Sequence, residues 1–212
     1  MDVDRFSRLP LMGIVRGITL FHIEPLIETV IEAGLETIEV TMNTPDAASI
    51  ISKACDVSRG RITIGAGTVL SEKELKDALD AGASFIVLPN SEEDVVISCV
   101  EKSIPVFPGA LTPSEVLKAW KMGSTMVKVF PSSAFGPPYI KELKGPFGDV
   151  KLMAVGGVRL ENIEEYFSSG ADAVAFGGSV FKKEWLLKGD FTSIGKLVKK
   201  YVEAVRSVKT AM

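Results

Sequence analysis

Short apolar segments alternate with longer amphipathic segments along the chain. Eight of the apolar segments have the length and the β-branched or aromatic content of buried strands. These segments are Leu11–Val15, Thr37–Met42, Ile62–Gly65, Phe85–Leu88, Pro105–Phe107, Met126–Phe130, Lys151–Val155 and Ala173–Phe176. Eight alternating units in 212 residues favour an α/β fold, a (β/α)8 TIM barrel in a single domain over residues 1–212. A doubly wound open sheet is the alternative fold.

The segments between the strands carry start and stop signals of helices. Ser71, Ser91 and Thr112 each have an acidic residue three positions later, which is typical of a helix N-cap. Four of the predicted helices end on a glycine, which readily adopts the left-handed conformation of a C-terminal cap. These glycines are Gly34, Gly82, Gly123 and Gly170.

A common register relates four of the strands. The position five residues beyond each capping glycine is Glu39, Val87, Lys128 or Ala175, on the second, fourth, sixth and eighth predicted strands. Alternate strands of a (β/α)8 barrel build shared interior layers. The spacing therefore predicts that Glu39 and Lys128 point into the same interior region.

Lys128 is out of place in its apolar strand, where Val127 and Val129 flank it. Burial lowers the pKa of a lysine, so that part of the amine becomes neutral and nucleophilic near neutral pH. A neutral buried amine is what Schiff-base formation with a carbonyl requires. The structural alternatives are a buried ion pair, or an edge-strand lysine whose amine reaches water. Glu39 is equally unusual in its strand, and two opposite charges predicted for one layer favour a functional site.

Glycine pairs follow the last two predicted strands. Gly156-Gly157 and Gly177-Gly178-Ser179 can offer backbone N–H groups and a hydroxyl to an anion. Loops at these two positions form the usual phosphate site of a (β/α)8 barrel. Tight turns without a ligand are the alternative.

Arg16 and Thr68 are candidates for binding a substrate carboxylate. Arg16 ends the first predicted strand and can bind a carboxylate in a bidentate manner. Thr68 follows the Gly65-Ala66-Gly67 loop and offers a hydroxyl. The alternatives are a surface salt bridge for Arg16 and a plain turn for the loop.

Composition narrows the classes of function. A net charge of −3 and the lack of a basic stripe argue against nucleic-acid binding. The apolar stretches are far shorter than the roughly 20 residues of a membrane span, and the polar N-terminus does not resemble a secretory signal, which suggests a cytoplasmic protein. A single histidine, His22, excludes the usual serine or cysteine triad and a histidine-rich zinc site.

The ordered motifs resemble the pyruvate-type class I aldolases, which act on 2-keto-3-deoxy-6-phosphogluconate (KDPG), its galactonate epimer and 4-hydroxy-2-oxoglutarate. The resemblance extends from about Leu11 to Phe191. It is carried by Ile38-Glu39-Val40-Thr41, Gly65-Ala66-Gly67-Thr68-Val69-Leu70, Val127-Lys128-Val129-Phe130-Pro131, Gly156-Gly157-Val158 and Gly177-Gly178-Ser179.

This resemblance implies a lyase that releases pyruvate and glyceraldehyde 3-phosphate, with 4-hydroxy-2-oxoglutarate as a further substrate. It implies that Lys128 forms the Schiff base and that Glu39 moves protons. Thr68, Phe130 and Pro89 line the pyruvyl pocket, and the late glycines and Ser179 hold the phosphate. It also implies a homotrimer that needs no metal and no cofactor.

The chain departs from the gluconate-type enzymes at two positions. Asn43 stands at the pocket position where some members have a carboxylate-binding arginine, so Arg16 becomes the candidate for that task. Val155 replaces a threonine before the first glycine pair, and the segment from Phe130 to Pro137 is closer to the galactonate branch. The two epimers stay open as substrates.

Two other functions are compatible with the phosphate loops. One is a different phosphosugar isomerase or lyase, and the other is a phosphosugar-binding barrel without aldolase activity. Neither requires a buried lysine paired with a glutamate, so Lys128 and Glu39 favour the aldolase.

Overall fold

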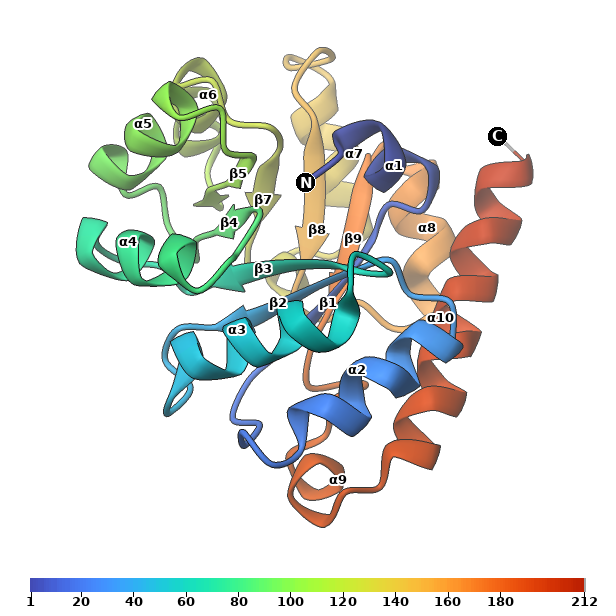
Figure 1. Cartoon of the computed structure of the whole chain (residues 1–212). Helices are drawn as coiled ribbons and strands as arrows, with labels where there is room; N and C mark the ends of the chain where they lie inside the picture. The colour runs from blue at the N-terminus through green and yellow to red at the C-terminus, as the bar shows by residue number, and fades with distance from the viewer. Residues whose placement is uncertain (212) are drawn as a thin grey trace.

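Parallel strands curl into a barrel, with helices on its outside (Figure 1). The computed structural model describes residues 1–211. Its strands follow the order β5-β4-β3-β2-β1-β9-β8-β7-β6, and their recorded pairings are parallel. The strands are β1 Leu11–Val15, β2 Thr37–Thr41, β3 Thr63–Gly67, β4 Ile86–Val87, β5 Val106–Phe107, β6 Gly109–Ala110, β7 Val127–Val129, β8 Leu152–Val155 and β9 Ala173–Phe176.

The barrel closes because β5 and β6 are successive parts of one strand. Strand β5 pairs with β4, whereas β6 pairs with β7. Pro108 separates the two parts, and its carbonyl accepts a 2.8 Å hydrogen bond from the backbone N–H of Lys128. Proline lacks the N–H that a continuous ladder would use. With β5 and β6 taken together, the prediction of a (β/α)8 barrel is confirmed, and the doubly wound alternative is wrong.

The helices connect successive strands and cover the barrel. They are α1 Val3–Arg8, α2 Ile23–Glu32, α3 Ala47–Ser58, α4 Glu72–Asp80, α5 Glu93–Glu101, α6 Pro113–Lys121, α7 Pro137–Lys144, α8 Ile163–Ser168, α9 Lys183–Lys188 and α10 Phe191–Ala211, with 3-10 turns η1 Ser132–Ala134 and η2 Leu160–Asn162. The long helix α10 packs beside α2 and α8 (Figure 1). Among these helices none has both the length and the apolar character needed to cross a membrane.

The predicted helix signals are correct with one exception. Ser71 caps α4 by accepting a hydrogen bond from the Glu74 N–H, and Thr112 forms a capping box with α6. Helix α5 instead begins after Glu92, because the Ser91 hydroxyl donates to the Gly109 carbonyl at 2.8 Å. The four glycines predicted as caps have positive φ angles of 84°, 95°, 90° and 99°, which confirms their role. They are Gly34, Gly82, Gly123 and Gly170.

Buried apolar side chains form one core between the strands and the helices and a second core inside the barrel. The inner core contains Val87 and Ala175, as the predicted register requires. It also contains Phe6 from helix α1, whose ring centre lies 6.0 Å from that of Phe107. The Met1 amino group donates to the carbonyl of Ser84, just before β4. Helix α1 therefore covers the amino-terminal ends of the strands.

Candidate active site

A cavity of about 1010 Å³ lies at the opposite, carboxyl-terminal end of the barrel. Its lining comes from β2 and from the ends of β1, β3, β4, β7, β8 and β9. Eleven of the residues singled out in the sequence line this one cavity. They are Arg16, Glu39, Thr68, Pro89, Lys128, Phe130, Gly156, Gly157, Gly177, Gly178 and Ser179. Residues that are far apart in the sequence thus share a single space.

Asn43 was expected in the substrate pocket, but it does not line this cavity. The residue is exposed in the turn that follows β2. In that turn the Thr44 N–H donates to the Thr41 carbonyl at 2.9 Å, and the two threonine hydroxyls lie 3.1 Å apart. Asn43 is therefore held within this turn, at an exposed position outside the cavity lining.

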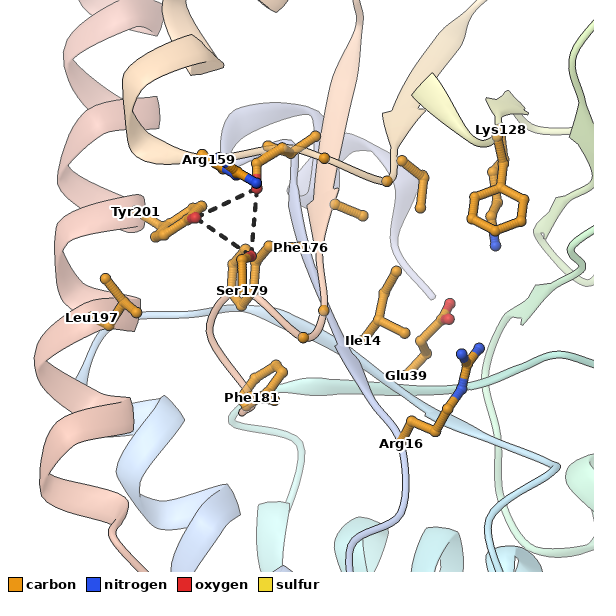
Figure 2. A pocket seen from close by; sticks show the side chains of 18 of the residues that line it. Ile14, Arg16, Glu39, Lys128, Arg159, Phe176, Ser179, Phe181, Leu197 and Tyr201 are labelled. Carbon is orange, nitrogen blue, oxygen red and sulfur yellow. Dashed lines mark hydrogen bonds between the residues drawn. The ribbon is translucent and has the colours of Figure 1, made fainter. Parts of the chain in front are cut away.

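Lys128 points into the cavity from β7, where it is aligned with Gly109 on one side and Met153 on the other (Figure 2). Only 5% of the residue is exposed. Burial lowers the pKa of its amine, the nearby Arg16 cation lowers it further, and Glu39 partly opposes both effects. The amine lies 4.9 Å from the centre of the Phe130 ring. Lys128 therefore carries an amine that loses its proton more readily than an exposed lysine does.

Glu39 faces the same space from β2, between Ile14 and Gly65 on the neighbouring strands. It is 1% exposed, and its Oε2 atom is buried without a hydrogen-bond partner. Burial raises the pKa of this carboxyl group to about 7, despite the opposing charges of Lys128 and Arg16. A carboxyl group with this pKa can both donate and accept a proton near neutral pH.

Lys128 and Glu39 line the same cavity but do not form an ion pair. No carboxylate in residues 1–211 lies within ion-pair distance of Lys128. Figure 2 shows the side chains of Lys128, Glu39 and Arg16 directed toward the same part of the cavity. The cavity lies between the amine of Lys128 and the carboxyl group of Glu39.

Arg16 and Thr68 flank Glu39 from the ends of β1 and β3. The guanidinium Nη2 of Arg16 donates to the Thr68 hydroxyl at 3.4 Å. Thr68 has a φ angle of 55°, which is unfavourable for a β-branched residue and is typical of strained functional positions. Together the two residues offer a cation and a hydroxyl to an anionic group beside Glu39 and Lys128.

The glycine-lined end of the cavity is formed by the segments after β8 and β9. Gly156 and Gly157 have φ angles of 92° and 77°, and a side chain at Gly157 would collide with Ser133. At Gly178 no atom lies within 4 Å of the place of a β-carbon, so the space beside it is open. Such loops present backbone N–H groups to an anion without obstruction by side chains.

Four polar residues at this end were not predicted from the sequence: Arg159, Glu161, Lys183 and Tyr201. Arg159 is two positions beyond the Gly156-Gly157 pair, and a longer reading of that motif would have included it. Lys183 begins α9 and Tyr201 belongs to α10, and neither has a local sequence signal. Arg159 and Lys183 outweigh the carboxylate of Glu161 at the glycine-lined end, and the net positive charge there favours an anion.

In the described part of the chain, no three His, Cys, Asp or Glu side chains come together as a protein-bound metal ion would require. The groups that face the cavity centre are an amine, a carboxyl group and a guanidinium group. A buried lysine with a lowered pKa at the carboxyl end of a (β/α)8 barrel is the arrangement expected of an enzyme that forms a Schiff base with a carbonyl substrate.

Comparisons with known proteins agree with this class and identify the family. The family model described as "Aldolase: KDPG and KHG aldolase" matches residues 3–197. The chain therefore belongs to the family of KDPG and KHG aldolases, which are class I aldolases and hence lyases. Among curated relatives, the 2-dehydro-3-deoxy-6-phosphogalactonate aldolase of Escherichia coli K12 is 34% identical over 201 residues, which cover 94% of this chain and 98% of that protein.

Solved structures show the same fold. The structure described as "Native KDPGal structure" has a TM-score of 0.89 and 32% identity, and the match covers 95% of this chain and 97% of that chain. The KDPG aldolase of Legionella pneumophila, with pyruvate captured as a covalent carbinolamine, has a TM-score of 0.85 and 28% identity. That match covers 92% of this chain and 94% of the other. Both galactonate-type and gluconate-type enzymes are thus similar to this chain.

Proposed function

We propose that this aldolase cleaves a 2-keto-3-deoxy-6-phospho sugar acid, KDPG or its galactonate epimer, to pyruvate and glyceraldehyde 3-phosphate through a Schiff base on Lys128. The observation that carries the proposal is the buried amine of Lys128 in one cavity with the buried carboxyl group of Glu39. The covalent carbinolamine named for the Legionella pneumophila relative supports the same chemistry.

The first half of the reaction builds the electron-accepting group. The neutral amine of Lys128 attacks the C2 ketone and forms a carbinolamine. Glu39 donates a proton to the departing hydroxyl, water leaves, and a protonated imine remains. A pKa near 7 suits this step because a substantial fraction of Glu39 carries a proton at neutral pH.

The second half breaks the carbon–carbon bond. The carboxylate of Glu39 accepts the proton of the C4 hydroxyl, the C3–C4 bond breaks, and its electron pair moves into the imine to give an enamine. Glyceraldehyde 3-phosphate leaves. Glu39 then returns its proton to C3 of the enamine, and water adds to the resulting imine, releasing pyruvate and the free amine of Lys128.

The other cavity residues orient the substrate. We assign the C1 carboxylate to Arg16 and Thr68, which adjoin Glu39, and the C6 phosphate to the glycine-lined end. Pro89 and Phe130 line the space around the pyruvyl group. 4-Hydroxy-2-oxoglutarate shares the C2 ketone and the C4 hydroxyl, so the same two residues can cleave it without the phosphate contacts. The homotrimer expected from the resemblance stays a prediction.

Trapping with borohydride tests the Schiff base. The protein is incubated with pyruvate, reduced with borohydride and digested, and the modified peptide is identified by mass spectrometry. We expect a reduced pyruvyl group on Lys128, and no adduct in the Lys128→Met variant. An adduct on a different lysine, or no adduct although pyruvate binds, would contradict the assignment.

Assays of pyruvate release then identify the substrate. KDPG, its galactonate epimer and 4-hydroxy-2-oxoglutarate are compared under the same conditions. The galactonate epimer is the first to test because the Escherichia coli relative at 34% identity is a galactonate-type aldolase. Cleavage of neither phosphorylated epimer, by a protein that forms the Lys128 adduct, would overturn the substrate assignment and leave the Schiff-base chemistry intact.

A further inference from the structure

Tyr201 stands behind Ser179 at the glycine-lined end of the cavity, and neither the family model, which ends at residue 197, nor the proposed mechanism gives it a role. Its ring packs against that of Phe176 in β9 with centres 4.8 Å apart, and the residue is only 2% exposed. Helix α10 thereby places a phenol hydroxyl against the segments that follow β8 and β9 (Figure 2).

Three oxygen atoms form a triangle at this point. The Tyr201 hydroxyl lies 3.4 Å from the carbonyl oxygen of Val158 and 3.5 Å from the Ser179 hydroxyl. The Ser179 hydroxyl lies 3.4 Å from the same Val158 carbonyl. These distances are at the long end of hydrogen bonding, so the triangle can adjust when a ligand binds.

The number of hydroxyl protons limits how many hydrogen bonds can form among these three oxygen atoms. Tyr201 and Ser179 each have one hydroxyl proton, and burial raises the pKa of Tyr201, so the phenol retains its proton. Val158 is buried, and in the described contacts its carbonyl has Ser179 and Tyr201 as donors. An unsatisfied buried carbonyl is unfavourable, so at least one of the two protons is held there.

Ser179 differs from Tyr201 because it is exposed and faces the cavity. If Tyr201 donates to the Val158 carbonyl, the Ser179 proton is free to point at a ligand. Without the phenol hydroxyl, Ser179 becomes the remaining donor to Val158 and is turned away from the cavity.

We infer that Tyr201 is a positioning residue, which occupies the Val158 carbonyl so that Ser179 can donate its hydroxyl proton to a phosphate oxygen of the substrate. This inference rests on the proposed placement of the substrate phosphate at the glycine-lined end. It adds a residue of the C-terminal helix to the recognition of phosphorylated substrates and gives it no part in bond cleavage.

The test combines Tyr201→Phe and Ser179→Ala in a double-mutant cycle. We expect Tyr201→Phe to raise the KM of the phosphorylated substrate about fivefold, which corresponds to about 1 kcal/mol. The kcat, the borohydride adduct of Lys128 with pyruvate and the kinetics with 4-hydroxy-2-oxoglutarate should stay unchanged. In the Ser179→Ala background, Tyr201→Phe should have no further effect on KM, because the serine it positions is gone.

Tyr139→Phe is the matched control. Its hydroxyl also donates to a backbone carbonyl, that of Leu111 at 2.6 Å, and it does not line the cavity. Competition by inorganic phosphate against the phosphorylated substrate gives a second readout, and Tyr201→Phe should weaken it as it weakens the substrate. An equal effect of Tyr201→Phe with and without Ser179, an equal effect on the unphosphorylated substrate, or no effect on KM would each overturn the inference. If the proposed function itself is wrong, the wild-type protein will form no Lys128 adduct or will cleave no phosphorylated substrate. In that case, the affinities of the wild-type protein and the variants for inorganic phosphate can still be compared directly.

Discussion

Gly67 provides the space in which the carboxylate of Glu39 lies. A β-carbon at Gly67 would overlap the Oε1 atom of Glu39, although the backbone of Gly67 has no positive φ angle that would itself demand glycine. Gly65, two residues earlier on the same strand, makes room for the Phe85 ring in the same way. The glycines of β3 therefore fit interior side chains of the barrel, and the buried acid depends on one of them.

A methyl group at Gly67 should therefore disturb Glu39. We expect Gly67→Ala to lower kcat by about 100-fold or more, which is the range for losing a positioned proton-transfer group. Overpacking should also lower the free energy of unfolding by about 1–3 kcal/mol. Steady-state kinetics and urea denaturation measure the two effects.

A shorter acid tests whether Gly67 acts through Glu39. Glu39→Asp removes one methylene and withdraws the carboxylate from Gly67. Adding Gly67→Ala to Glu39→Asp should lower kcat much less than adding it to the wild-type protein. Equal losses in both backgrounds would show that Gly67 affects activity by another route.

The pKa of Glu39 predicts the dependence of the reaction on pH. Dehydration of the carbinolamine needs the protonated carboxyl group of Glu39, which is lost as the pH rises through about 7, whereas attack on the ketone needs the neutral amine of Lys128, which becomes more abundant with rising pH. We expect a bell-shaped dependence of kcat/KM on pH, with a falling limb above about 7 whose apparent pKa belongs to the coupled pair. Glu39→Gln should lower kcat/KM and remove the Glu39-dependent part of this limb. An unchanged profile in that variant would assign the limb to another group.

The same pKa predicts a change in stability with pH. Burial raises the pKa of Glu39 from an ordinary 4.5 to about 7, so the folded state favours the protonated form. The stability that this proton contributes is present below pH 4.5 and is lost as the pH rises through about 7, by about 3 kcal/mol in all. Glu39→Gln, which is neutral at every pH, should gain stability relative to the wild-type protein over this interval.

Urea denaturation of both proteins across that interval measures the difference. Glu203→Gln, at an exposed position of α10, controls for the loss of a carboxylate at the surface. A stability difference between Glu39→Gln and wild type that does not change with pH would contradict the buried, proton-retaining state of Glu39.

Arg159 should distinguish phosphorylated from unphosphorylated substrates. It lines the glycine-rich end of the cavity, and its removal leaves Lys183 as the neighbouring cation there. We expect Arg159→Ala to raise the KM of the phosphorylated substrate about fivefold to tenfold, and to leave 4-hydroxy-2-oxoglutarate almost unaffected. The effect should diminish at high salt, because exposed charges are screened. Lys182→Ala is the control, since Lys182 lies over the Trp185 ring and does not line the cavity. Equal KM changes for the two substrates would place Arg159 outside phosphate recognition.

The central pair of the site could be predicted because its geometry is local. A glycine cap fixes where each helix ends, and a short connection fixes how far along the next strand an interior position lies. Glu39 and Lys128 each lie five residues after a capping glycine, Gly34 and Gly123. This equal spacing predicted that they belong to the same interior layer. The period of two along a strand then determined that both face inward.

Other features depend on contacts between distant segments and left little trace in the sequence. Helix α1 is short and mostly polar, and its interior role is visible only from Phe6 against Phe107. Strand β6 was not predicted; it follows Pro108, which has no N–H to donate but whose carbonyl still accepts a hydrogen bond from the Lys128 N–H. Tyr201 reaches the cavity from α10 after the last βα unit, so no strand-end motif could have indicated it.

The apolar floor beneath Lys128 has a consequence for the fate of the reaction intermediate. Phe6 and its neighbours fill the barrel below the cavity, and Val155 and Ala175 belong both to that filling and to the cavity wall. In the proposed reaction, the water that hydrolyses the imine must therefore enter through the opening by which the aldehyde leaves. While the aldehyde remains there, the enamine is shielded from water and can rejoin it. In the proposed reaction, a barrel sealed at one end thus allows the carbon–carbon bond to be remade as well as broken.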